Sequence, residues 1–161
     1  MKRARRAKAE GKAPSTRAGE FVHEEIEHVR EGKHGARNAK QAIAIGLSKA
    51  RRAGVDVPPP KAGTTSERTR KIAQRDRARG HSATPRAPSP RRSRATSGAL
   101  KREGHESASS LALGRNARSA AGRKSPSQRS KSAQKAVRTK GPAARKSAAR
   151  KAARTRARRA S

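Results

Sequence analysis

The chain has no cysteine, no tryptophan and no tyrosine, and its one phenylalanine is Phe21. Without cysteine it cannot form a disulfide framework, a thiolate zinc site or a cysteine nucleophile. With so few aromatic rings it is poorly equipped to stack bases, which is how many proteins hold single-stranded nucleic acid. Only 30% of the residues are hydrophobic, and many of those are alanine, so a large core is excluded as well.

Long apolar runs are missing too. The longest strongly apolar stretch, residues 42–47, is far shorter than the roughly 20 residues that span a bilayer. The basic N-terminal residues are not followed by an apolar segment, as they would be in a secretory signal. We therefore expect no membrane partner and a cytoplasmic location.

Acidic residues are scarce and unevenly placed. The chain has 44 Lys and Arg against 11 Asp and Glu, a formal net charge of +33, and no acidic residue follows Glu106. Residues 122–161 hold fifteen cations. Such a tail repels itself but suits a row of phosphates, because each phosphate that it neutralises releases condensed counterions. Charge alone predicts nucleic acid as the main partner.

Low hydrophobicity combined with high net charge is typical of chains that stay unfolded over most of their length. We predict a mostly disordered protein with a small all-α module of two to three short helices. The expected segments are a basic disordered arm (1–14), a small helical module (15–80), a linker rich in Pro, Ser and Arg (81–97), a weakly helical segment (98–121) and a disordered basic tail (122–161).

The first helix of the module is expected to begin at Ser15 or Thr16 and to end at Gly32. Its apolar stripe is Val22, Ile26 and Val29, at helical spacing, with Phe21 beside it. The same segment contains five of the eleven acidic residues of the chain, which we interpret as a solvated acidic face. These residues are Glu20, Glu24, Glu25, Glu27 and Glu31.

A second helix has the clearest local signals. Asn38 is a suitable N-cap, Gly54 a suitable left-handed C-terminal residue, and Val55 can then fold back onto the helix. Its small and apolar face is Ala39, Ala42, Ile43, Gly46, Leu47, Ala50 and Ala53. We expect Ile43 and Leu47 to pack on the first helix or on a second copy of the chain, which would make a homo-oligomer.

A third helix is expected over residues 65–79, with Thr64 and Glu67 at the spacing of a capping box and Gly80 at its end.

Motifs for catalysis are absent. His23 and His28 flank a run of glutamates, but a zinc-protease helix needs two histidines four apart, and these are five apart. There is no phosphate-binding Gly-Lys-Ser/Thr loop and no recognisable setting for a nucleophile. We predict a protein that is not an enzyme, with no cofactor, no metal and no small-molecule substrate.

Two resemblances add to this interpretation. Residues 40–51, Lys-Gln-Ala-Ile-Ala-Ile-Gly-Leu-Ser-Lys-Ala-Arg, resemble the core of a small, uncharacterised bacterial domain family found in short, basic proteins. Asn38 and Ala39 depart from the Ser-Arg or Ser-Lys often seen before that core. The resemblance implies a bacterial origin and brings no activity. The basic tail is similar in composition to bacterial histone-like proteins and linker-histone tails, and residues 89–92, Ser-Pro-Arg-Arg, match a pattern of such tails.

The sequence therefore predicts non-enzymatic, largely sequence-independent binding of double-stranded DNA, as in histone-like or nucleoid-associated proteins. Two alternatives stay open: an RNA- or ribosome-associated basic protein, or a protein-interaction module at residues 38–54 with an accessory tail. The residues expected to contact phosphates are Lys2, Arg3, Arg5, Arg6, Lys49, Arg51, Arg52, Arg91, Arg92, Arg94, Arg123, Lys124, Arg145, Lys146, Arg150, Lys151, Arg154, Arg156, Arg158 and Arg159.

Overall fold

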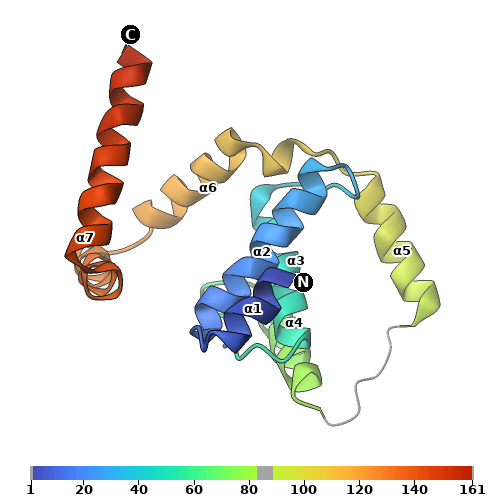
Figure 1. Ribbon diagram of the computed structural model, residues 1–161. Coiled ribbons are helices and arrows are strands. Elements are labelled where there is room, and N and C mark those ends of the chain that lie inside the picture. Colours follow the sequence, from blue (N-terminus) through green and yellow to red (C-terminus); the bar gives the residue numbers. More distant parts are fainter. Residues whose placement is uncertain (1, 83–88, 161) are drawn as a thin grey trace. The chain divides into compact units, whose positions relative to one another are not determined.

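The computed structural model describes residues 2–82 and 89–160, and every regular element in them is a helix (Figure 1). The elements are α1 (Lys2–Ala9), α2 (Pro14–Arg30), α3 (Ala39–Arg52), α4 (Glu67–Gly80), α5 (Pro90–Lys101), the 3₁₀ helix η1 (Glu106–Ala108), α6 (Ser110–Gly122) and α7 (Pro126–Ala160). The prediction of a mostly disordered chain with two or three helices is therefore wrong.

The high alanine content explains why the prediction of disorder was wrong. Alanine contributes little buried area, which is why average hydrophobicity indicated disorder, but it is also the strongest helix former. The arm and the tail, both expected to be disordered, contain α1 and α7. The expected linker contains the start of α5, and its residues 83–88 lie outside the described residues.

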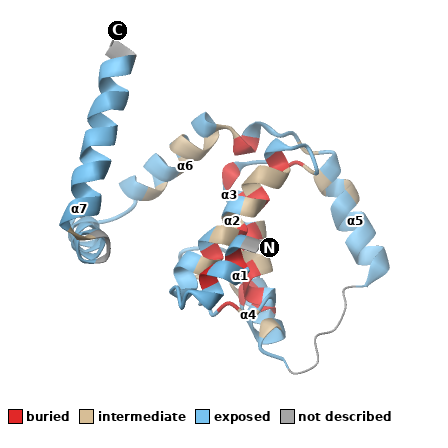
Figure 2. Ribbon diagram, in the orientation of Figure 1, coloured by how far each residue is buried: buried red, intermediate tan, exposed pale blue. Residues whose placement is uncertain are grey.

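The chain divides into two compact units, residues 1–116 and residues 117–161, which are described separately below. Buried residues gather within α1 to α4 and around η1, whereas α7 is exposed along nearly its whole length (Figure 2).

The centre of the first unit is the contact between α2 and α3. Phe21 is 5% exposed and packs with Ala18 of its own helix and Ala50 of α3. The two backbones approach closely at Gly46, where an added Cβ would lie 2.7 Å from the Cα of Val22. Small residues on α3 permit this approach, since a larger side chain would hold the helices apart.

The ends of α3 follow the sequence signals, whereas α2 begins at Pro14, with Ala13 at the N-cap position and no side-chain cap, ahead of the predicted Ser15 or Thr16. The side-chain oxygen of Asn38 accepts a hydrogen bond from the backbone N–H of Gln41 at 2.9 Å, as predicted for an N-cap. Gly54 adopts a φ of 76°, and the backbone N–H of Val55 donates to the carbonyl of Ala50. The predicted C-terminal cap is confirmed.

The third predicted helix is α4, and its N-cap differs from the expected one. The hydroxyl oxygen of Ser66 accepts from the backbone N–H of Thr69, whereas the Thr64 hydroxyl donates to the Lys61 carbonyl. α4 packs on α3 through buried Ala73 and Asp76. The N-cap differs from the predicted one because three consecutive hydroxyl residues, Thr64, Thr65 and Ser66, offer equivalent capping chemistry.

The N-terminal helix α1 is tied to α2. Ala4 and Ala7 are both buried, and Ala4 belongs to the cluster that contains Phe21 and Ala18. Their three-residue spacing puts both methyl groups on one face of the helix. The arm is therefore part of the folded unit.

Residues 100–108 complete the core from a distance in the sequence. Ala108 of η1 is fully buried in a second cluster with Val29, Ala36 and Ala42. Backbone hydrogen bonds join residues 100–108 to the loop between α2 and α3. The N–H of Gly35 donates to the carbonyl of Leu100 at 2.8 Å. Part of the segment predicted to be weakly helical is thus a structural component of the module.

We expect Gly46→Ala to lower the free energy of unfolding by about 1–3 kcal/mol, because the new methyl group must push α2 away. Gly19→Ala is the matched control on the facing helix, since a Cβ there meets nothing within 4 Å. That control should be neutral or gain up to about 1 kcal/mol from helix propensity. Urea unfolding followed by circular dichroism measures both, and equal effects would contradict the close approach.

Candidate functional site

The second unit carries cations and no acid in residues 117–161. Every residue of α7 whose burial is described is exposed, apart from Gly141. The predicted phosphate contacts in this unit are Arg123, Lys124, Arg145, Lys146, Arg150, Lys151, Arg154, Arg156 and Arg158, all exposed, and Arg159, whose side chain lies outside the described residues. This unit therefore presents exposed cations with no acidic side chain among them.

α7 is two helical segments joined at a kink. Gly141 has a φ of 65° and a ψ of 172°, and Pro142 follows it. The segment over residues 142–160 is about 28 Å long at the rise of an α-helix. Lys146, Arg150 and Arg154 recur at steps of four and so share a face, although such like-charge pairs oppose helix formation in the absence of counter-charge.

The linker cations lie on the first turns of α5. Arg91, Arg92 and Arg94 are exposed, and Pro90 occupies the start of the helix. The Ser-Pro-Arg-Arg segment is thus the beginning of a helix in this structure, with Ser89 at the N-cap position.

The cations of α1 are partly paired within the module. The guanidinium of Arg3 lies 3.1 Å from a carboxylate oxygen of Glu20, and that of Arg6 lies 2.7 Å from Glu10. The hydrogen bond from Arg6 lowers the pKa of the Glu10 carboxyl. Arg5 is exposed, and the side chain of Lys2 lies outside the described residues. These pairs must be displaced before the same cations can contact phosphate.

Arg51 is directed inward. Its guanidinium donates to the carbonyls of Val57 and Pro58, each at 3.1 Å, and the residue is 7% exposed. Burial lowers the pKa of the Arg51 side chain, while the charge of Asp76 opposes that shift. Arg51 holds the segment after α3 in place, whereas its neighbour Arg52 is exposed.

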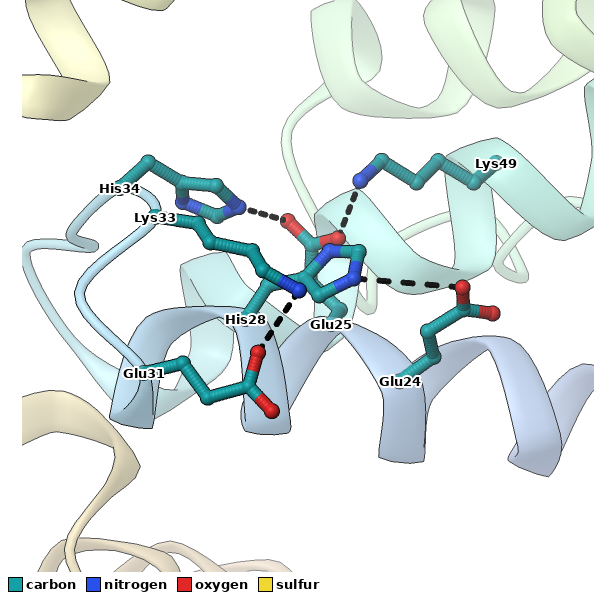
Figure 3. A network of polar contacts seen from close by, with 7 residues as sticks. All are labelled: Glu24, Glu25, His28, Glu31, Lys33, His34 and Lys49. Carbon is teal, nitrogen blue, oxygen red and sulfur yellow. Dashed lines mark hydrogen bonds and ion pairs between the residues drawn. The ribbon is translucent and has the colours of Figure 1, made fainter.

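A buried carboxylate lies at the centre of a polar network on α2 (Figure 3). Glu25 is 1% exposed and forms an ion pair with Lys49 of α3. Its other oxygen lies 3.2 Å from Nε2 of His34. Like Arg51, Lys49 already has a partner within the module, so both of these predicted phosphate contacts would have to be released before they could bind phosphate.

The interpretation of Glu25 as part of a solvated face is wrong. Phe21, Glu25 and Val29 recur at steps of four, so the carboxylate shares the buried face of α2. The spacing was present in the sequence, but the cluster of neighbouring glutamates obscured it. The remaining acids lie outside this face, and Glu20, Glu27 and Glu31 form ion pairs with nearby cations.

The comparisons give one match. Residues 5–61 match the family described as "Family of unknown function (DUF6496)". This segment contains most of α1, all of α2 and α3, and the Lys-Gln-Ala-Ile-Ala-Ile-Gly-Leu core, in agreement with the resemblance to an uncharacterised domain family. Searches of curated proteins and of solved structures found no match. Among the described residues, no helix is both long enough and apolar enough to cross a membrane.

We expect Arg51→Met to lower the free energy of unfolding by about 2–3 kcal/mol, because two carbonyls lose a charged donor and Asp76 loses a nearby cation. Arg52→Met removes the same charge from an exposed position and should change stability by less than about 0.5 kcal/mol. Thermal unfolding of the two variants provides the comparison, and similar midpoints would contradict the structural role of Arg51.

Proposed function

We propose that this protein binds double-stranded DNA without enzymatic activity and largely independently of base sequence. The observation that carries the proposal is the acid-free, exposed cationic surface of residues 117–161. In the bacterial setting that the family resemblance implies, such a protein would act in the cytoplasm, associated with the nucleoid.

Phosphate contact is the interaction that these residues favour. B-DNA carries about one negative charge per 1.7 Å of its axis, so a cationic helix of about 28 Å can neutralise several phosphates. An α-helix with side chains is about 10–12 Å wide and fits the major groove, which is about 12 Å wide. The scarcity of aromatic side chains argues against base stacking.

The cations most suited to this role are those of α7 and the start of α5. They are exposed, and the second unit provides no carboxylate to compete with phosphate. Lys49 and Arg51 are left out of the proposed interface, because Glu25 and backbone carbonyls already hold them.

The structure bears on one of the two alternatives, a protein partner at residues 38–54, and leaves RNA binding to experiment. RNA offers the same phosphate chemistry, and competition between duplex DNA and structured RNA at matched salt separates the two. A protein partner at residues 38–54 would find much of the α3 face occupied, since Ala42, Gly46 and Ala50 are buried against the module. We therefore retain DNA as the proposal.

Removal of residues 122–161 should weaken DNA binding and flatten its salt dependence. The slope of log K against log salt is about −0.9 per phosphate neutralised. Removal of fifteen cations should therefore make the slope less steep by an amount that corresponds to several lost phosphate contacts. Fluorescence anisotropy with a labelled duplex at several salt concentrations gives the slope.

A variant in which residues 122–161 are scrambled at constant composition is the control. It should keep the slope and most of the affinity, because phosphate contact depends on charge density more than on order. An unchanged slope after removal of the segment would contradict the proposal.

A further inference from the structure

We infer that Glu25, His28 and His34 form a binding site for a divalent transition-metal ion, with zinc the best match. Each residue offers one ligand atom, and the three atoms lie within 4.8 Å of one another. Glu25 and His28 are three apart on α2, and His34 comes from the loop that leads to α3 (Figure 3). The inference concerns the folded module and does not depend on DNA binding.

The first argument is the state of the Glu25 carboxylate. One oxygen, Oε2, accepts from the ammonium of Lys49. The other, Oε1, is buried and receives no hydrogen bond from any residue in the described part of the chain. A buried carboxylate oxygen without a donor is costly, and its lone pairs point to a missing positive partner.

The second argument is the hydrogen bonding of His34. Its Nδ1 lies 3.0 Å from the carbonyl oxygen of Gly35, and a carbonyl can only accept, so the proton is on Nδ1. In the neutral ring Nε2 then presents a bare lone pair, 3.2 Å from Glu25 Oε1. Two lone pairs at that distance repel unless a cation lies with them. Metal-binding histidines commonly donate their second ring N–H to a backbone carbonyl in this way.

The third argument is the position of His28. Its ring centroid lies 6.4 Å from that of His34, with the rings nearly perpendicular, and a nitrogen of each converges on Glu25. Nε2 of His28 also lies 3.9 Å from a carboxylate oxygen of Glu24. A nearby carboxylate is a frequent outer partner of a metal-bound histidine.

The donor set indicates the metal. Two imidazole nitrogens and one carboxylate oxygen suit zinc and similar divalent ions, whereas magnesium and calcium prefer oxygen alone. A tetrahedral ion would keep its fourth position for water. Lys49 bonds Oε2 of Glu25, the other oxygen of the same carboxylate, and its charge opposes a second positive charge, which predicts moderate affinity.

The bound ion would tie the loop before α3 to α2. Ala36 of this loop and Val29 of α2 belong to one buried cluster, so the metal would add a second link between the same two segments. Its effect on stability follows the metal concentration relative to its Kd.

The test uses the full-length, nucleic-acid-free and metal-free protein at high salt. Cobalt(II) is titrated and followed by its visible absorption, and zinc is then added to displace it. We expect one equivalent of cobalt, an absorption band typical of four-coordinate geometry, displacement by zinc, and a higher Tm with zinc.

Substitutions decide whether the site is the proposed one. His28→Asn and His34→Asn should each weaken binding at least tenfold, and Lys49→Met should preserve or tighten it if the variant remains folded. His23→Asn and His81→Asn are matched controls that should bind as the original protein does. Glu25→Gln changes a buried group, so the circular dichroism of that variant is recorded first, and His28, whose side chain is 28% exposed, carries the decision.

Two results would overturn the inference. Equal losses in the His23 and His81 variants would mean that surface histidines bind the metal nonspecifically. Absence of cobalt binding, together with stability that depends on protonation of His34, would mean that a proton occupies the place between His34 and Glu25.

Discussion

The close approach of α2 and α3 at Gly46 is the constraint on which the rest of the module depends. With few large apolar side chains, the chain gains packing by bringing backbones together, so that Ala42, Gly46 and Ala50 lie directly against α2. This contact gives Phe21 its buried position and places Lys49 beside Glu25. A small core can thus organise a polar network that an average of hydrophobicity does not predict.

Acidic and basic residues are distributed differently in the two units. All eleven acidic residues belong to residues 10–106, where many of them pair with cations of the module. Residues 117–161 have cations and no internal counter-charge, so their helix lacks the pairing that supports α2. The excess charge of the protein is therefore concentrated where it is also most exposed, which is the arrangement that favours an external polyanion.

The sequence predicted the module well at positions where a single residue sets the local backbone conformation. Asn38 and Gly54 set the ends of α3, because capping chemistry is local. Ala108 gave no comparable signal, since its burial depends on contacts with Val29 and Ala36 far away in the sequence. Disorder was wrongly predicted because helix formation by alanine and burial by alanine are separate properties.

The candidate sites also differ in how far the sequence could predict them. Charge composition predicted the exposed cations of α7, since exposure needs no partner. It did not indicate that Arg51 and Lys49 have partners within the module, because that depends on where α3 packs. The convergence of His34 on Glu25 also had no sequence signal, because a loop of undetermined path separates them.

The most direct test of the account is hydrogen exchange of the full chain with and without duplex DNA. Amides of α2 and α3 should exchange slowly in both states, because their hydrogen bonds are covered by packing. Amides of α7 should exchange rapidly alone and slow markedly when DNA is bound. Protection that appears in α2 and α3, with α7 unchanged, would contradict the division between a folded module and a DNA-binding cationic helix.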